Sequence, residues 1–147
     1  MFARLRRRLF MGAAWLTLVL VRFCLPRLGY RRVYGGMYRC SPVPGDRINM
    51  QRCRANARLV DRAALRRMQP PATCLHRSLA LWWLLRFQGL RTQIRIGARR
   101  QEAKGWDLHA WVEHEDVIIN DDPNKIATYH LMPDRLADDA AQRGQSR

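Results

Sequence analysis

The most regular run of apolar residues in the chain extends from Cys74 to Gln88. Thr73, immediately before this run, is a good helix N-cap, and Gly89, immediately after it, is a helix stop signal. Apolar side chains occupy most of the circumference of this segment, at positions 75, 79, 81–85 and 87. Because a helix that is apolar on nearly all sides belongs in the interior, we expect a central buried helix here.

Apolar and polar residues then alternate with the period of two that is typical of β-strands. The alternation covers residues 91–98 and again 106–113, and residues 117–120 form a short apolar run. The segment 99–105 is a polar connection, and His114-Glu115-Asp116 is a turn signal. These features predict an antiparallel sheet that follows the buried helix.

The region before the buried helix is expected to contain two helices. A helical pattern runs from Phe10 to Phe23 and is closed by Pro26, and a second one runs over residues 52–68. Residues 29–50 are rich in Gly, Pro and Tyr, which is typical of an irregular connection. Helices followed by an antiparallel sheet predict an α+β fold.

The chain has 147 residues, which is enough for one domain, and a formal net charge of +15. This charge is concentrated in residues 1–67, which carry 16 basic and 2 acidic side chains. Such a basic region favours an anionic partner or surface. Nucleic acid is disfavoured, because no helix-turn-helix, zinc finger or aromatic RNA-binding motif accompanies the charge.

The N-terminal apolar helix leaves more than one interpretation open. The uncharged stretch Leu9–Val21 would span about 20 Å as a helix, which is shorter than the roughly 30 Å hydrocarbon core of a bilayer. Residues 22–27 offer no small-x-small cleavage site, so a signal peptide is disfavoured. A core or interfacial helix is the favoured interpretation and a membrane anchor the alternative, so we expect a cytoplasmic protein with membrane association left open.

Four cysteines are present, at positions 24, 40, 53 and 74. Without a credible export signal, reduced thiols are expected. A zinc site built from Cys40, Cys53, Cys74 and His76 lacks the paired spacing that identifies such sites. We therefore expect neither a metal nor a cofactor.

Cys74 is a candidate nucleophile, because the first turn of a helix offers free amides and a dipole that favour a thiolate. A hairpin centred on Glu115 would place His109 directly opposite Asp121, so that the carboxylate could fix the imidazole tautomer. Asp122 would fall on the other face and is the weaker candidate. His76 would project about 200° away from Cys74 on the helix, which makes it a poor base.

These residues resemble a known family. The resemblance rests on residues 71–81, Leu84-Leu85-Arg86, Gly89, Ile94-Arg95-Ile96-Gly97, residues 108–113 and Asn120-Asp121. Together they resemble the transglutaminase-like cysteine peptidase of lasso peptide biosynthesis, the B protein that removes the leader from the precursor. The similarity is dense over residues 52–123 and looser at the N-terminus.

The resemblance implies a papain-like or transglutaminase-like fold with Cys74 as nucleophile, His109 as base and Asp121 as orienting acid. The division expected is a basic, apolar helix with an irregular connection over 1–51, the peptidase core over 52–133 and a frayed polar tail over 134–147. Few residues precede the core, and they show no strand pattern for leader recognition. The sequence therefore resembles the peptidase half of a split B protein.

The partners implied are the precursor peptide and a separate small leader-binding protein, with the lasso cyclase as a further candidate. Two other functions stay open from the sequence. The same three residues could serve a transglutaminase-like acyltransferase, because the sequence does not distinguish water from an amine as the acceptor. A non-catalytic basic adaptor at a membrane surface is the other alternative.

Overall fold

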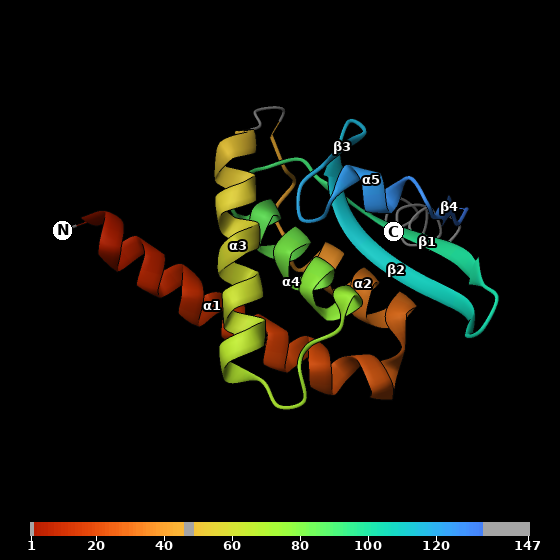
Figure 1. The fold of residues 1–147 in the computed structure, drawn as a ribbon. Coiled ribbons are helices and arrows are strands. Elements are labelled where there is room, and N and C mark those ends of the chain that lie inside the picture. The colour runs from red at the N-terminus through yellow and green to blue at the C-terminus, as the bar shows by residue number, and fades with distance from the viewer. Residues whose placement is uncertain (1, 46–48, 134–147) are drawn as a thin grey trace.

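Helix α4 (Cys74–Phe87) is the central element of the computed structural model, which describes residues 2–45 and 49–133. It contacts helices α1, α2 and α3 as well as strands β1 and β2, so that helices and sheet lie around it (Figure 1). The other elements are α1 (Phe2–Leu28), α2 (Tyr30–Arg39), α3 (Met50–Arg67), β1 (Gln93–Gln101), β2 (Gly105–His114), β3 (Val117–Ile118), α5 (Pro123–Ile126) and β4 (His130–Leu131). The tail predicted over residues 134–147 lies outside the described residues.

The core forms between α4, the helices before it and one face of the sheet. Trp82 on α4 is 1% exposed, and its burial contributes on the order of 5 kcal/mol as an upper bound. The core-facing residues of the strands include Ile94, Ala110 and Val112, which are all buried. Because side chains alternate along a strand, the residues that alternate with these core-facing ones, including His109, lie on the opposite face.

The four strands are antiparallel in the order β3-β2-β1-β4. Strands β1 and β2 pair along their whole length, from Gln93 with Glu113 to Gln101 with Gly105. Residues 99–101 and 105 therefore belong to strands, and the polar connection predicted over 99–105 is shorter than expected. His130 lies in β4.

The helical region differs from its prediction at two points. Residues 30–39 form α2, so the irregular connection predicted over 29–50 is wrong for this part. The reason is tertiary packing: Tyr34 stacks on Trp82 with ring centroids 4.7 Å apart, and Trp83 donates a hydrogen bond to the Met37 carbonyl at 2.9 Å. These contacts with α4 outweigh the poor helix propensity of the two glycines in α2.

Helix α1 is longer than expected, because it runs from Phe2 to Leu28 and contains Pro26 in its last turn. Its inner face packs into the core through Ala14, Leu18 and Val21, each at most 1% exposed. The segment Arg4–Leu28 is long and apolar enough to cross a membrane, and 22% of its apolar window is buried. Core helices of soluble proteins and signal sequences can also meet this criterion of length and composition.

Candidate active site

Cys74 is the first residue of α4, where a capping box orders the helix end. The Thr73 hydroxyl accepts the His76 amide, and His76 Nδ1 accepts the Thr73 amide at 3.3 Å. Burial, together with the positive charge of Arg22, lowers the pKa of His76, which keeps Nδ1 available as an acceptor. His76 is therefore a capping residue, and Cys74 lies in a well-formed first turn with its free amides and dipole.

His109 and Asp121 form a directly bonded pair. His109, on β2, is 8% exposed, and its Nε2 is hydrogen-bonded to Asp121 Oδ2. The Asp121 carboxylate also accepts the amide of Asp122 at 2.9 Å and the ammonium of Lys125 at 3.2 Å. Burial raises the pKa of Asp121, but these hydrogen bonds and the Lys125 charge outweigh it, so the pKa lies below its ordinary value.

The pair forms although the predicted strand register is wrong by one residue. Glu113 pairs with Ile118 and His114 with Val117, so the turn is centred between Glu115 and Asp116. Both turn residues have positive φ, 45° and 66°, as a two-residue hairpin turn requires. Strand β3 then ends at Ile118, and Asp121 reaches His109 from the following loop rather than from a paired strand position.

Side chains replace the strand ladder where β3 ends. Asn120 Oδ1 accepts the Val112 amide at 2.7 Å, and Ser78 on α4 donates to the Ala110 carbonyl at 2.9 Å. Asn120 Nδ2 also donates to Ser78 Oγ at 3.2 Å, which ties the loop, the strand and the helix together. Nothing in the sequence pattern indicates these roles for Asn120 and Ser78.

This junction fastens α4, the helix that Cys74 begins, to the strand that carries His109. Ser78 follows Cys74 by four residues, so the two share one face of α4 about one turn, 5.4 Å, apart. Ser78 is bonded to Ala110, the residue next to His109. The ring of Tyr129 lies 5.2 Å from that of His109, and burial together with the hydrogen bond to Asp107 raises the pKa of Tyr129.

Aromatic residues surround the imidazole on its sheet face. The rings of Trp111 and His109 are stacked with centroids 6.3 Å apart. Tyr129, from the segment before β4, donates its hydroxyl to Asp107 at 2.8 Å. Gly97 pairs with His109 across the strands, and a Cβ there would lie 2.9 Å from both Trp111 and Tyr129. A glycine in a predicted strand can indicate that another part of the chain packs closely against it, although the sequence does not identify that part.

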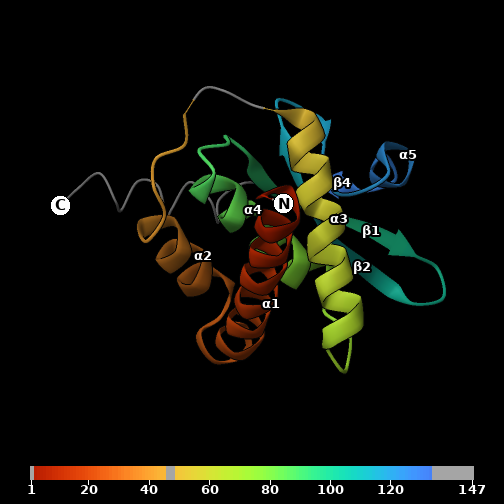
Figure 2. The ribbon, with the colours of Figure 1, turned by 90° about the vertical axis from the view of Figure 1, so that its left-hand side faces the viewer.

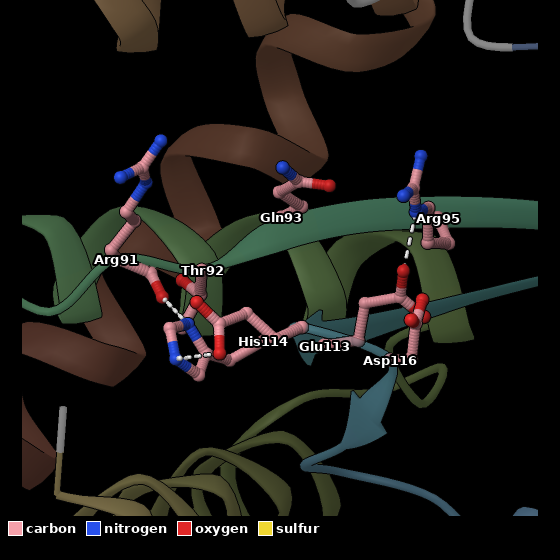
Figure 3. Close-up of a pocket in the computed structure, with 8 residues that line it drawn as sticks. Arg91, Thr92, Gln93, Arg95, Glu113, His114 and Asp116 are labelled. Carbon is pink, nitrogen blue, oxygen red and sulfur yellow. Dashed lines mark hydrogen bonds and ion pairs between the residues drawn. The ribbon is translucent and has the colours of Figure 1, made fainter.

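A small polar pocket lies further along the same face of β2 (Figure 3). Its volume is about 250 Å³, and it is lined by Glu113 among other residues of β1, β2 and the turn. Glu113 accepts hydrogen bonds from Trp111 at 3.2 Å and from Arg95 at 2.5 Å. Glu113 is four residues from His109, about 13 Å along a strand, so this pocket does not contain the candidate catalytic residues.

The described residues contain no group of three or more His, Cys, Asp or Glu side chains that could hold a metal ion. Of the candidate zinc ligands, Cys53 is buried in the helical core, whereas Cys40 is exposed after α2.

Comparison with protein families identifies the chain at this point. The model of a family described as the transglutaminase-like superfamily matches residues 15–133, which include all three candidate residues. The chain belongs to the transglutaminase-like superfamily. No match was found among curated proteins or among solved structures.

Membership agrees with the α+β architecture predicted from the sequence, and that prediction is confirmed. The transglutaminase-like superfamily is one of cysteine peptidases and acyltransferases, both of which form an acyl-enzyme on a cysteine. In this transglutaminase-like protein, Cys74, His109 and Asp121 are the candidate residues for that chemistry.

Proposed function

We propose that this transglutaminase-like protein is a cysteine peptidase that cuts the precursor of a lasso peptide between leader and core. It acts as the peptidase half of a split B protein, in the cytoplasm, together with a separate leader-binding protein. The observation that carries the proposal is the bond between His109 and Asp121 on the strand to which Ser78 fastens α4, the helix that begins at Cys74. The sequence resemblance supports the choice of substrate.

The bond between His109 and Asp121 supports one direction for the proposed proton transfer. Because Asp121 occupies Nε2 of His109, Nδ1 is the nitrogen left to take the proton of the Cys74 thiol. The thiolate then attacks the carbonyl carbon of the last leader residue, and the first-turn amides of α4 stabilise the resulting oxyanion. His109 returns the proton to the amine of the core peptide, which leaves, and the leader stays bound as a thioester.

Water completes the reaction in the same site. His109 removes a proton from water, the hydroxide attacks the thioester carbonyl, and the Cys74 thiolate leaves as the leader carboxylic acid forms. An amine in place of water would give transfer of the leader rather than hydrolysis. The superfamily includes both outcomes, so the products must be identified chemically.

The test is a cleavage assay on precursor peptide, with the leader-binding protein present, followed by mass spectrometry. The wild type is expected to release free leader and free core, and Cys74→Ala is expected to release neither. Cys40→Ala is the matched control, because Cys40 is an exposed cysteine outside the site. Undiminished cleavage by Cys74→Ala would refute the mechanism, and a joined leader–amine product would establish acyl transfer instead.

Association with a membrane surface is a second proposal, supported by the outer face of α1. Leu16, Leu20 and Phe23 are each at least 48% exposed and lie opposite the face that packs into the core. Since Leu18 and its neighbours are held in the core, α1 can lie along a membrane surface but cannot span a bilayer without leaving the fold. Sedimentation with anionic vesicles tests this proposal, and a protein that stays fully in the supernatant contradicts it.

A further inference from the structure

A groove of about 840 Å³ opens between the N-terminal halves of α1 and α3. The two helices are in contact and lie side by side in Figure 2, and the N-terminal half of α1 extends beyond the other elements in Figure 1. The apolar surface of the groove comes from Leu9, Phe10 and Ala13 on α1 and from Ala55 and Leu59 on α3. This apolar surface together with the charges around it makes the groove a candidate docking site.

The charged side chains that line this groove all have the same sign. Arg6 and Arg7 lie on the α1 side and Arg52 on the α3 side, and no described lining residue is Asp or Glu. Arg52 Nε is buried and has no hydrogen-bond partner in the described part of the chain. The Arg52 side chain as a whole is half-buried in the groove lining, and a guanidinium can bind a carboxylate through two parallel hydrogen bonds. The groove therefore fits a ligand that is apolar on one side and carries carboxylates on the other.

We propose that the α1–α3 groove binds an amphipathic helix of a partner protein, with its apolar residues on the groove floor and its carboxylates against Arg6, Arg7 and Arg52. That the partner is the protein presenting the substrate rests on the proposed function. A bilayer is a less suitable occupant, because a flat surface would contact the outermost side chains of α1 rather than the half-buried Phe10 and Ala55 in the groove.

The position of the groove is compatible with catalysis while the partner is bound. Gln88, the C-cap of α4, lines the groove and accepts a hydrogen bond from Asn56 at 2.9 Å. Cys74 begins the same helix, whose 14 residues span about 21 Å. A partner in the groove would therefore leave the first turn of α4 open to the peptide.

The experiment measures peptide binding by fluorescence anisotropy, using the full chain with Cys74→Ala so that cleavage plays no part. The probe is a labelled synthetic helix of about three turns, with Leu on one face and Glu on the other, and a peptide with Lys in place of Glu is the ligand control. The groove variant is Arg6→Glu with Arg52→Glu. Both positions lie near helix N-termini, where a carboxylate suits the dipole and the fold is expected to persist, as circular dichroism can verify.

The matched control is Arg54→Glu with Arg58→Glu, which changes the charge equally on exposed α3 positions that do not line the groove. We expect the Glu peptide to bind, the Lys peptide not to bind, and the groove variant to lose at least about tenfold in affinity while the control variant stays within about twofold of the parent protein. Added salt should weaken the binding, because Arg6 and Arg7 are exposed to solvent.

Three results would overturn the proposal: no binding of the Glu peptide, equal losses in the two double variants, or binding of phosphatidylserine–phosphatidylcholine vesicles at the groove arginines without peptide binding. The last result would assign the groove to a membrane surface. Failure of the cleavage assay would remove the proposed function but would leave a measured groove affinity intact, so the two failures are distinguishable.

Discussion

Gly97→Ala tests whether the wall behind His109 is as tightly packed as the structure indicates. Gly97 pairs with His109 across β1 and β2. An added Cβ would lie 2.9 Å from Trp111 Cη2, 2.9 Å from Tyr129 Cβ and 3.0 Å from Trp111 Cζ3. Since carbon atoms pack at about 3.5–4.0 Å, the neighbours would have to move by about 0.6–1.1 Å.

Neither neighbour can move freely. Trp111 is 3% exposed and its Nε1 is held by Glu113, while the contact with Tyr129 is made through Cβ, which moves only with the backbone. Overpacking of this kind costs about 1–3 kcal/mol of stability. A shift of the rings around His109 by about 1 Å would also disturb the imidazole, and such a displacement can reduce the rate about 100-fold.

The assay compares the free energy of unfolding from urea titration with kcat/KM for precursor cleavage. Gly12→Ala is the matched control, because a Cβ at this exposed position in α1 meets no atom within 4 Å. It should gain about 0.5–1 kcal/mol through helix propensity and leave activity unchanged. If Gly97→Ala has wild-type stability within about 0.5 kcal/mol and wild-type kcat/KM, the packing argument is wrong.

Three further predictions concern the junction beside His109. Asp121→Ala removes the acceptor of His109 Nε2 and should lower kcat/KM about 100-fold or more. Asp121→Asn keeps an oxygen acceptor and should lower kcat/KM less. Steady-state kinetics that give the two variants the same kcat/KM would contradict this role. Asn120→Ala leaves the amide of the fully buried Val112 without a partner and should cost about 1–3 kcal/mol in urea titration, an effect that a merely surface role would not produce. The pKa of Asp121 is lowered in the folded protein, so its stabilising contribution is fully present above the ordinary carboxyl pKa and is lost as the pH falls through the lowered value. The free energy of unfolding, measured against pH, should therefore fall less in acid for Asp121→Asn than for the wild type.

Features with local causes were predictable from the sequence. The start of α4 follows from the Thr73 cap and its end from Gly89, whose φ of 72° a glycine adopts without strain. The strands follow from alternation, and His76 was set aside as a base because helix geometry points it away from Cys74. These signals depend on neighbours within a few residues, so they can be read from the local sequence without knowing the rest of the fold.

Features with distant causes were not predictable in the same way. Helix α2 contains Gly35 and Gly36, and its local sequence favours a loop; its helical state depends on the stacking of Tyr34 against Trp82, 48 positions later. The length of the β1–β2 hairpin was underestimated for a similar reason, since polar residues such as Arg99 pair with Asp107 across the strands.

The sequence alone determined which residue types are available for chemistry, Cys74 at a helix start and His109 in a strand with Asp121 shortly after it. Only the tertiary structure decided how His109 and Asp121 meet. The strand that was expected to carry Asp121 ends at Ile118. Beyond it, the Asn120 side chain accepts a hydrogen bond from the Val112 amide of β2, and Ser78 on α4 donates one to the Ala110 carbonyl of the same strand. The chain is thereby free to turn Asp121 towards the imidazole, and this outcome depends on three distant segments satisfying each other's buried polar groups.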